Sequence, residues 1–394
     1  MQQEAPLRYA LILTLGTALS VGAFAAFAQT PAKPATQAAA TAAPKYDPTK
    51  PYPAYTAPRL KIGQPDLQGF WANSTLTKMT RPRGVTGLVY TEEEAAKLEH
   101  EMVEEIEEGQ APTAKDAPAA YVIPKDIKPE YLAGGGATGG YNRFWIDPGN
   151  HVMRVNGQPR TSLLTTPNGQ PPARKAGATP APAPEPPAFI KLLGDSPIPR
   201  GGAFDNPESR SSERCIIGFG RNGGPPMFAN GFYNNSYQIV QSPDNVVITT
   251  EMVHDARIVR LNSKHRTDGL RPYFGDSIGW FDGDTLVVET TNIPQSQQFM
   301  GAWKDLKVTE KFKRVAADRL YYAFTVEDPT LWDAPWGGEY EFHPLGGTMY
   351  EYACHEGNYA LHGVLAGARV QEARAAAAEK AKAKPAPKPA KGGQ

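Results

Sequence analysis

Alternating hydrophobic and polar positions dominate the second half of the chain. The stretch YQIVQSPDNVVITTEMVHDARIVRL, at 237–261, predicts two strands joined at the turn-forming cluster SPDN. In the second strand, every other residue from Val246 to Ala256 shares one face if no bulge intervenes. Further hairpins or strand pairs are predicted by the patterns at 276–293, 306–329 and 337–356.

The predicted fold is mainly β. Antiparallel strands with short turns and no intervening helices favour a meander, and the edges of a long sheet must be closed or covered. We therefore expect an antiparallel β-barrel with long loop insertions and one or two helices; a β-sandwich or a partial propeller is the alternative. The GFW motif at 69–71 and Arg369 after the last strand are similar to the lipocalin-like barrel layout. One helix is predicted by TEEEAAKLEHEMVEEIEEG, where Thr91 and Glu94 form a capping box.

The ends of the chain and one internal segment differ in composition from the strand-rich region. Arg8, an apolar run and an Ala-x-Ala site predict a secretory signal peptide that is cleaved after Ala28, with an uncleaved membrane anchor as the alternative. The mature chain is expected in the periplasm or secreted, with no stable membrane insertion. The predicted organisation is a signal peptide at 1–28, a disordered linker at 29–58, one β-rich globular domain at 59–369 with a Pro-rich insertion at 179–188, and a disordered Lys/Ala/Pro-rich tail at 370–394.

Composition narrows the classes of partner. The chain holds 41 Lys and Arg residues against 41 Asp and Glu residues, and this balance argues against a nucleic-acid partner, which favours a basic face. The two cysteines, Cys215 and Cys354, lie far apart in the sequence. In an oxidising compartment they are expected to form one disulfide that closes a long loop, with a reactive thiol as the alternative.

The motif MVHDARIVRL holds the first candidates for chemistry. His254 is a candidate general base, because such a base needs a pKa near the working pH and a partner that orients its ring. Asp255 and Arg257 are catalytic candidates beside it. The alternatives are a strand-end histidine bonded to backbone and a plain salt bridge between Asp255 and Arg257, which share a face in a regular strand.

A second candidate is a pair of carboxylates in the hairpin at 276–293. With a two-residue turn at Asp282-Gly283, counting outward places Asp276 opposite Glu289. Two carboxylates across a ladder repel each other unless a cation, a shared proton or an Arg lies between them. Trp280 lies on the same face and suggests a partly apolar wall. A different loop length would instead shift the register by one and turn both carboxylates to solvent.

The motif YEYACHEGNY supplies two further catalytic candidates, His355 and Glu356. A disulfide at Cys354 would hold both side chains rigidly beside a pocket. Their spacing to His362 does not match the His-Glu-x-x-His zinc motif, so no metal site is expected. No cofactor is expected either, because Rossmann, P-loop and haem-attachment patterns are missing from the sequence.

Ligand-binding residues are expected in the loop RCIIGFGRNGGPPMFANGFYNNSYQ, at 214–238. Its mixture of aromatic surface and a few hydrogen-bonding groups is typical of a small-molecule site. A well-packed loop anchored by its cysteine is the alternative. The predicted ligand-binding residues here and on the barrel strands are Trp71, Phe232, Tyr233, Asn234, Asn235 and Trp280.

Several longer motifs carry a resemblance to a family. GDSIGWFDGDTLVVETTN, YEYACHEGNYAL, SERCI, GFYNNSYQIVQSP and EMVHDARIV are similar to motifs of an uncharacterised family of exported bacterial proteins. The resemblance runs from DLQGFW to the GAR at 367–369 and implies that 59–369 is one unit. It implies an exported globular domain and no particular activity.

These observations support two main hypotheses of function. The first is an exported protein that binds a small organic molecule in a partly apolar pocket of a β-barrel. The second is a periplasmic hydrolase, lyase or isomerase that uses histidine and carboxylate groups for acid–base catalysis. An enzyme of this kind needs a histidine and a carboxylate within hydrogen-bonding distance inside a pocket, whereas a binding protein needs the pocket alone. A structural envelope protein, the third reading, needs no pocket.

Overall fold

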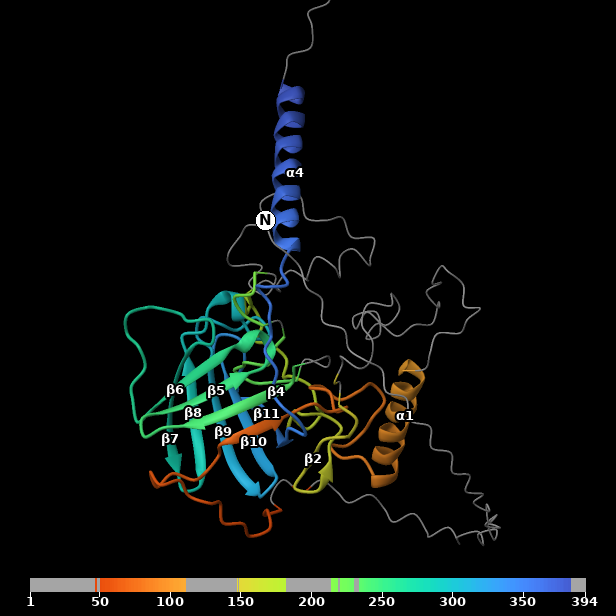
Figure 1. Ribbon diagram of the computed structural model, residues 1–394, viewed down its shortest axis with the longest axis vertical. Helices are drawn as coiled ribbons and strands as arrows, with labels where there is room; N and C mark the ends of the chain where they lie inside the picture. Colours follow the sequence, from red (N-terminus) through yellow and green to blue (C-terminus); the bar gives the residue numbers. More distant parts are fainter. Residues whose placement is uncertain are drawn as a thin grey trace, which may run out of the picture. The chain divides into compact units, whose positions relative to one another are not determined.

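The computed structural model describes residues 47, 50–110, 147, 149–181, 214–218, 220–229 and 234–383 (Figure 1). The predicted signal peptide, most of the predicted Pro-rich insertion, and the candidate residues Phe232 and Tyr233 lie outside the described residues. The described part of the chain is built around one β-barrel.

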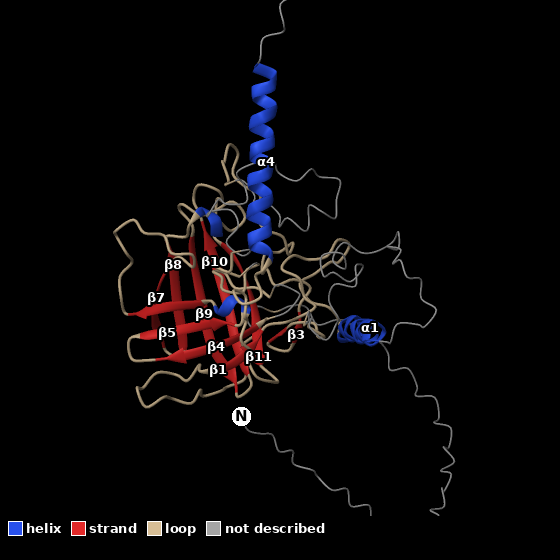
Figure 2. Cartoon of the chain, turned by 45° about the horizontal axis from the view of Figure 1, so that its top comes forward, coloured by secondary structure: helices blue, strands red, loops and turns tan. Residues whose placement is uncertain are grey.

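Nine strands form this closed barrel, which confirms the prediction of a mainly β fold (Figure 2). Because β4 to β11 follow one another around the wall, the barrel forms largely from hairpins, and β1 closes it by pairing with both β4 and β11. In order around the wall the strands are β1 (Gly69–Ala72), β11 (Trp336–Pro344), β10 (Arg319–Glu327), β9 (Lys307–Ala316), β8 (Thr285–Thr291), β7 (Asp276–Asp282), β6 (Ala256–Leu261), β5 (Asn245–Thr250) and β4 (Ser236–Gln241).

Three smaller features lie outside the barrel wall. A two-stranded sheet pairs β2 (Arg154–Val155) with β3 (Gln158–Pro159). Helix α1 (Glu92–Gln110) begins at the predicted capping box, in which the backbone N–H of Glu94 donates to Thr91 and the N–H of Thr91 donates to Glu94. Helix α4 (Ala360–Ala383) includes the start of the tail, which was predicted to be disordered; it is helical because its Ala, Glu and Lys residues have high helix propensity.

One pair of neighbouring strands is parallel, which the predicted antiparallel meander did not include. β6 and β7 run in the same direction, with Val259 opposite Ser277, while the other neighbouring pairs of the barrel are antiparallel. A closed ring with an odd number of strands cannot alternate direction throughout, so nine strands require a parallel pair. The connection at 262–275 returns the chain to the end of the barrel where β6 began, so that β7 can run parallel to β6; a parallel pair always needs such a long connection.

Large side chains fill the middle of the barrel. Tyr322 packs against Tyr340 with ring centroids 4.7 Å apart and against Phe312 at 5.0 Å. Met227 and Phe228, from the loop before β4, are also buried in this core. Each fully buried side chain of this size stabilises the fold by roughly 1.5–3 kcal/mol relative to an exposed one. The centre of the barrel is therefore a packed core, and the clefts described below lie outside it.

The prediction of one long strand after SPDN is wrong, because the chain turns between Thr250 and Ala256. β5 ends at Thr250 and β6 begins at Ala256, so the region holds three strands rather than two. Val253 and His254, in the turn between them, have positive φ angles of 55° and 45°. A β-branched residue such as Val253 rarely adopts this left-handed conformation, so the turn is held by its surroundings and not by local preference.

The predicted register of the β7–β8 hairpin is shifted by two residues. Asp282 pairs with Thr285, so the turn residues are Gly283 and Asp284, and Asp276 lies opposite Thr291 instead of Glu289. Gly283 has a φ of 58°, which a glycine at the first turn position adopts readily. A shift of two leaves every side chain on its predicted face.

The prediction of a pair of strands at 337–356 is also wrong, because only the first of the two forms. β11 ends at Pro344, and residues 345–359 form turns and irregular structure. The predicted disulfide in this region is confirmed, since Cys354 is bonded to Cys215 across 139 residues of sequence. The bridge holds this C-terminal segment, and not a strand, against the loop that precedes β4. No helix within the described residues is long and apolar enough to cross a membrane.

Candidate functional site

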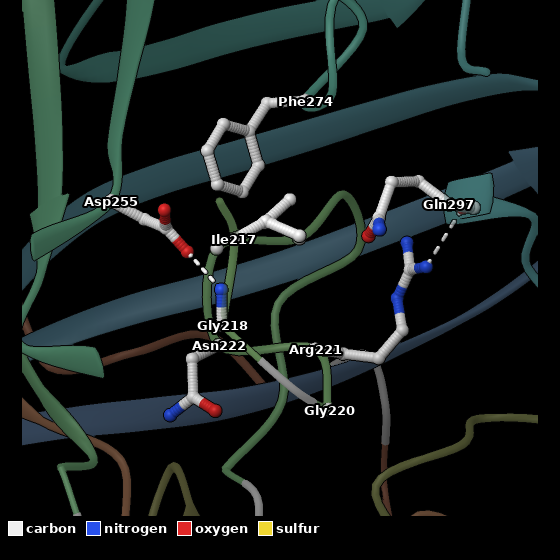
Figure 3. Close-up of a pocket in the computed structure, with 10 residues that line it drawn as sticks. Ile217, Gly218, Gly220, Arg221, Asn222, Asp255, Phe274 and Gln297 are labelled. Atoms are coloured by element: carbon white, nitrogen blue, oxygen red, sulfur yellow. Dashed lines mark hydrogen bonds between the residues drawn. The ribbon is translucent and has the colours of Figure 1, made fainter. Parts of the chain in front are cut away.

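Loops from four parts of the chain meet at the end of the barrel where β6 and β7 begin. They line a small pocket, which we call the mouth pocket, with a volume of about 10 Å³, room for about one water molecule (Figure 3). Its lining residues are Ile217, Gly218, Gly220, Arg221, Asn222, Gly223, Gly224, Asp255, Phe274 and Gln297. Most of them come from the glycine-rich loop at 214–229, which the disulfide anchors through Cys215.

Asp255 supplies a carboxyl group to the mouth pocket. Burial raises the pKa of Asp255 to about 6, although the hydrogen bond from the backbone N–H of Gly218, 2.7 Å from Oδ2, and the charge of His254 both act to lower it. The ring of Phe274 lies beside this carboxyl in the pocket (Figure 3). A Cβ atom added to Gly223 would lie 2.1 Å from Phe274 Cε1, so the ring packs directly on the glycine backbone. The carboxyl of Asp255 can therefore hold a proton near pH 6.

Arg221 lies on the other side of the same pocket (Figure 3). Its guanidinium donates to two backbone carbonyl groups, those of Gln297, at 3.1 Å, and Pro225, and it lies 5.0 Å from the ring centre of Phe299. Burial lowers the pKa of Arg221 to about 10, so the group stays positive at neutral pH. Within the described part of the chain no carboxylate pairs with it. The charge of Glu310 acts to raise this pKa, but Glu310 already pairs with Arg257 and does not offset the burial, so the arrangement favours a further anionic group in the pocket.

Arg257 is separated from Asp255 and lies inside the barrel. Its guanidinium makes two hydrogen bonds to Glu310, of 2.7 and 3.0 Å, and both side chains are fully buried. The hydroxyl of Tyr322 donates to the same carboxylate at 2.8 Å. The predicted alternative, a salt bridge between Asp255 and Arg257, is therefore wrong, because the turn before β6 turns their side chains apart. The Arg257–Glu310 pair joins β6 to β9 beneath the mouth pocket.

His254 makes no hydrogen bond to these groups in the described part of the chain. Its side chain is exposed, and no hydrogen bond to it is found among the described residues. The positive φ of His254 takes it out of the strand geometry from which its role was predicted. Asp255 and His254 are thus neighbours in sequence without forming a hydrogen-bonded acid–base pair.

A histidine that the sequence analysis missed joins the two carboxylates of the β7–β8 hairpin. His265 Nδ1 lies 2.9 Å from Asp276 Oδ2, and Nε2 lies 3.2 Å from Glu289 Oε1. We call these three residues the outer triad, because His265, in the 262–275 segment, meets the two carboxylates on the outer face of the barrel. Each ring nitrogen of His265 faces one carboxylate, so neither nitrogen is free to contact a ligand. The expected group between the carboxylates was a cation, a shared proton or an Arg, and the structure supplies an imidazole.

Further donors surround Asp276. Burial acts to raise the pKa of Asp276, but hydrogen bonds from the backbone N–H of Arg266, from His265 and from Arg260, at 2.7 Å, outweigh it and lower the pKa. Lys307 Nζ lies 3.7 Å from Glu289. Asp276 and Glu289 therefore each have cationic or hydrogen-bonding partners, and the outer triad is part of an ion-pair network that holds the 262–275 segment against the barrel wall.

The remaining predicted site residues are dispersed. Trp71 is buried, with its indole N–H donating to the carbonyl of Leu67 at 3.2 Å, and Trp280 is 39% exposed on the outer wall. Asn234 and Asn235 lie near the mouth pocket, where both accept hydrogen bonds from Asn222. His355 and Glu356 are exposed beside the disulfide. The structure therefore brings Asp255 and the two asparagines to one end of the barrel and separates the others from it.

No protein-family model, curated protein or solved structure matches this chain. Among the described residues, no group of three or more His, Cys, Asp or Glu side chains is arranged to hold a metal ion.

Proposed function

We propose that this chain is an exported protein that binds a small organic molecule through an anionic group at the mouth pocket. The observation that carries the proposal is the Arg221 guanidinium, which lines the pocket with backbone carbonyls as its partners and without a carboxylate partner in the described chain. A carboxylate ligand would supply the missing charge and accept charge-assisted hydrogen bonds.

Asp255 gives the pocket a second polar group, whose charge changes with pH. Near its pKa of about 6 the carboxyl of Asp255 is partly protonated and can donate a hydrogen bond to an anion. Phe274 and Ile217 provide the apolar part of the lining. Because the volume is about 10 Å³, room for about one water molecule, one oxygen atom of the anionic group would enter the pocket, and the rest of the ligand would lie over the loops outside.

Export is supported by two independent features. The disulfide between Cys215 and Cys354 is typical of proteins in oxidising compartments, and the apolar N-terminal segment with its Ala-x-Ala site resembles a secretory signal. Both agree with the resemblance to exported bacterial proteins.

The alternative proposal is a hydrolase, lyase or isomerase that uses acid–base catalysis. The raised pKa of Asp255 favours it, since such shifts cluster at catalytic sites. The binding protein is preferred, because His254 is not hydrogen-bonded to Asp255 and His265 has both ring nitrogens directed at carboxylates. Chemical conversion of a bound ligand by the protein would support the enzyme over the binding protein.

Thermal unfolding of the mature chain with formate, acetate, lactate or succinate tests the binding proposal, with the corresponding amides and sodium chloride as references. A ligand at 100 times its Kd adds ~2.7 kcal/mol of stability, a shift of several degrees in Tm. Arg221→Gln should abolish the shift. Arg271→Gln is the matched control, because Arg271 also donates to backbone carbonyls and lies over a ring, 5.2 Å from the centre of Trp303, but outside the pocket.

A shift by one or more carboxylates that is absent with amides and lost only in Arg221→Gln is the expected result. Equal shifts in both arginine variants, or no shift by any carboxylate at 50 mM, would overturn the proposal. Because Arg221→Gln removes buried hydrogen bonds, its circular dichroism is compared with wild type, and Asp255→Asn provides a second pocket variant that keeps an acceptor for Gly218.

A further inference from the structure

A second cleft, which we call the outer cleft, lies on the outer wall of the barrel and shares no residue with the mouth pocket. Its volume is about 340 Å³, within the range of small-molecule sites. We propose that it binds a small aromatic acid, independently of the function proposed above. Its lining residues are Asp47, Lys50, Pro51, Tyr52, Val155, Asn156, Gln158, Lys313, Tyr321 and Glu339.

The floor of the outer cleft is built by strand pairing. Tyr321 of β10 lies opposite Lys313 of β9 on one side and opposite Glu341 of β11 on the other. Glu339 follows on the same outward face of β11. The 50–52 segment and the turn between β2 and β3 form the opposite wall. The cleft therefore has a rigid floor of β-sheet, which holds its side chains in fixed positions.

Besides Asp47, whose backbone hydrogen-bonds to Gln158, two carboxylates of β11 lie at the floor of the cleft, and both are engaged. Glu339 accepts hydrogen bonds from the buried guanidinium of Arg160, at 2.5 Å, and from the hydroxyl of Tyr321, at 2.7 Å. Glu341 accepts from the hydroxyl of Tyr52, at 2.8 Å, and from a backbone N–H, at 2.7 Å. Burial, the larger cause, and the proximity of Glu339 raise the pKa of Glu341. The two glutamates orient the two tyrosines, and Arg160 compensates the charge of Glu339.

The ammonium groups of the cleft, in contrast, have no such partner. Lys50 and Lys313 both line it, and among the described residues neither side chain forms a hydrogen bond or an ion pair. Two cations facing one concave site attract an anion and give it a fixed orientation. The cleft therefore selects for negative charge at its lysine side.

The rings of two tyrosines favour an aromatic group in the ligand. The rings of Tyr52 and Tyr321 pack edge to face, with centroids 5.4 Å apart and an interplanar angle of 64°. Their hydroxyls are held by glutamates, so the rings present rigid apolar walls rather than free polar tips. An aromatic ring with one carboxylate matches this combination: the ring packs on the tyrosines and the carboxylate meets the lysines.

Titration calorimetry of the full mature chain tests the proposal with benzoate, its uncharged counterpart benzamide, and inorganic phosphate. Benzoate should bind, benzamide at least tenfold more weakly, and phosphate without measurable heat. Lys313→Gln should weaken benzoate at least tenfold. Lys311→Gln is the matched control, because Lys311 is an exposed lysine on the same outward face of β9 that does not line the cleft.

The variants also separate the two proposed sites. Benzoate affinity that survives Arg221→Gln and falls in Lys313→Gln supports the outer cleft. The proposal fails if benzoate does not bind at millimolar concentration, if phosphate or benzamide binds as well as benzoate, or if Lys313→Gln and Lys311→Gln weaken it equally. Binding lost in Arg221→Gln and kept in Lys313→Gln would assign the acid to the mouth pocket instead. Both lysines are exposed, so folding of the variants is expected and is checked by their Tm.

Discussion

At the scale of single residues, two aspartates on the barrel are tuned in opposite directions. Burial raises the pKa of Asp255 to about 6, whereas donors from three residues lower the pKa of Asp276 despite its burial. Within the described residues, the first carboxyl accepts one hydrogen bond, from Gly218, and the second has several charged partners. Asp255 therefore costs stability when ionised, which is typical of a residue kept for function, and Asp276 contributes stability when ionised.

Substitution of Asp255 by Asn should remove a pH dependence of stability. The folded protein binds the Asp255 proton more tightly than the unfolded chain does, so wild type loses stability as pH rises from about 4 through about 6. Asn cannot ionise and still accepts from Gly218. The variant should therefore equal wild type at pH 4 and exceed it at pH 8 in urea denaturation. Asp276→Asn is the control of opposite sign and should be less stable than wild type at pH 7. A flat difference between Asp255→Asn and wild type over this range would show that the aspartate is not perturbed.

At the scale of elements, the 262–275 segment makes the parallel pair of strands in the barrel. It carries the chain back along the wall, so that β7 runs in the same direction as β6, and it contacts the outer face of the β7–β8 hairpin. His265 holds it to Asp276 and Glu289, and Arg271 holds its end through the carbonyls of Ile293 and Lys304. The segment is therefore fastened by polar contacts, with little apolar burial of its own.

His265→Ala should loosen this segment. The substitution removes the two contacts of the imidazole and leaves two carboxylates without a partner between them, and we expect a loss of ~1–3 kcal/mol in the free energy of unfolding. Trypsin should also cleave faster after Lys264 or Arg266. The control is His100→Ala, because His100 forms an exposed pair with Glu104 on helix α1 and should change stability by less than ~0.5 kcal/mol. Equal destabilisation by both substitutions, with unchanged proteolysis, would rule out the fastening role.

At the scale of the whole molecule, the sequence indicated the barrel better than the sites on it. Hydrophobic alternation located most strands but missed the turn between β5 and β6 and the end of β11, and the presence of only two cysteines determined their pairing. The parallel pair was not visible in local patterns, because the need for it arises from the total number of strands. His265, Arg221 and Tyr52 lie in segments without periodicity, so their partners depend on where distant loops return. The repulsion expected between Asp276 and Glu289 was the one signal that could have pointed to His265.

The disulfide links the C-terminal segment to the mouth of the barrel, and its removal should affect the whole fold. Cys215 and Cys354 are separated by 139 residues, and the chain-entropy model assigns about 5 kcal/mol to closing a loop of that length in the unfolded chain. The variant with both cysteines replaced by serine should therefore melt on the order of 10 °C below oxidised wild type. A reducing agent should lower the Tm of wild type to that of the variant and leave the variant unchanged. If reduction leaves the Tm of wild type unaltered while both thiols become titratable, the bridge contributes nothing to global stability. The glycine-rich loop that lines the mouth pocket is then held by its buried residues Met227 and Phe228 and by the hydrogen bonds of Gly218 and Arg221.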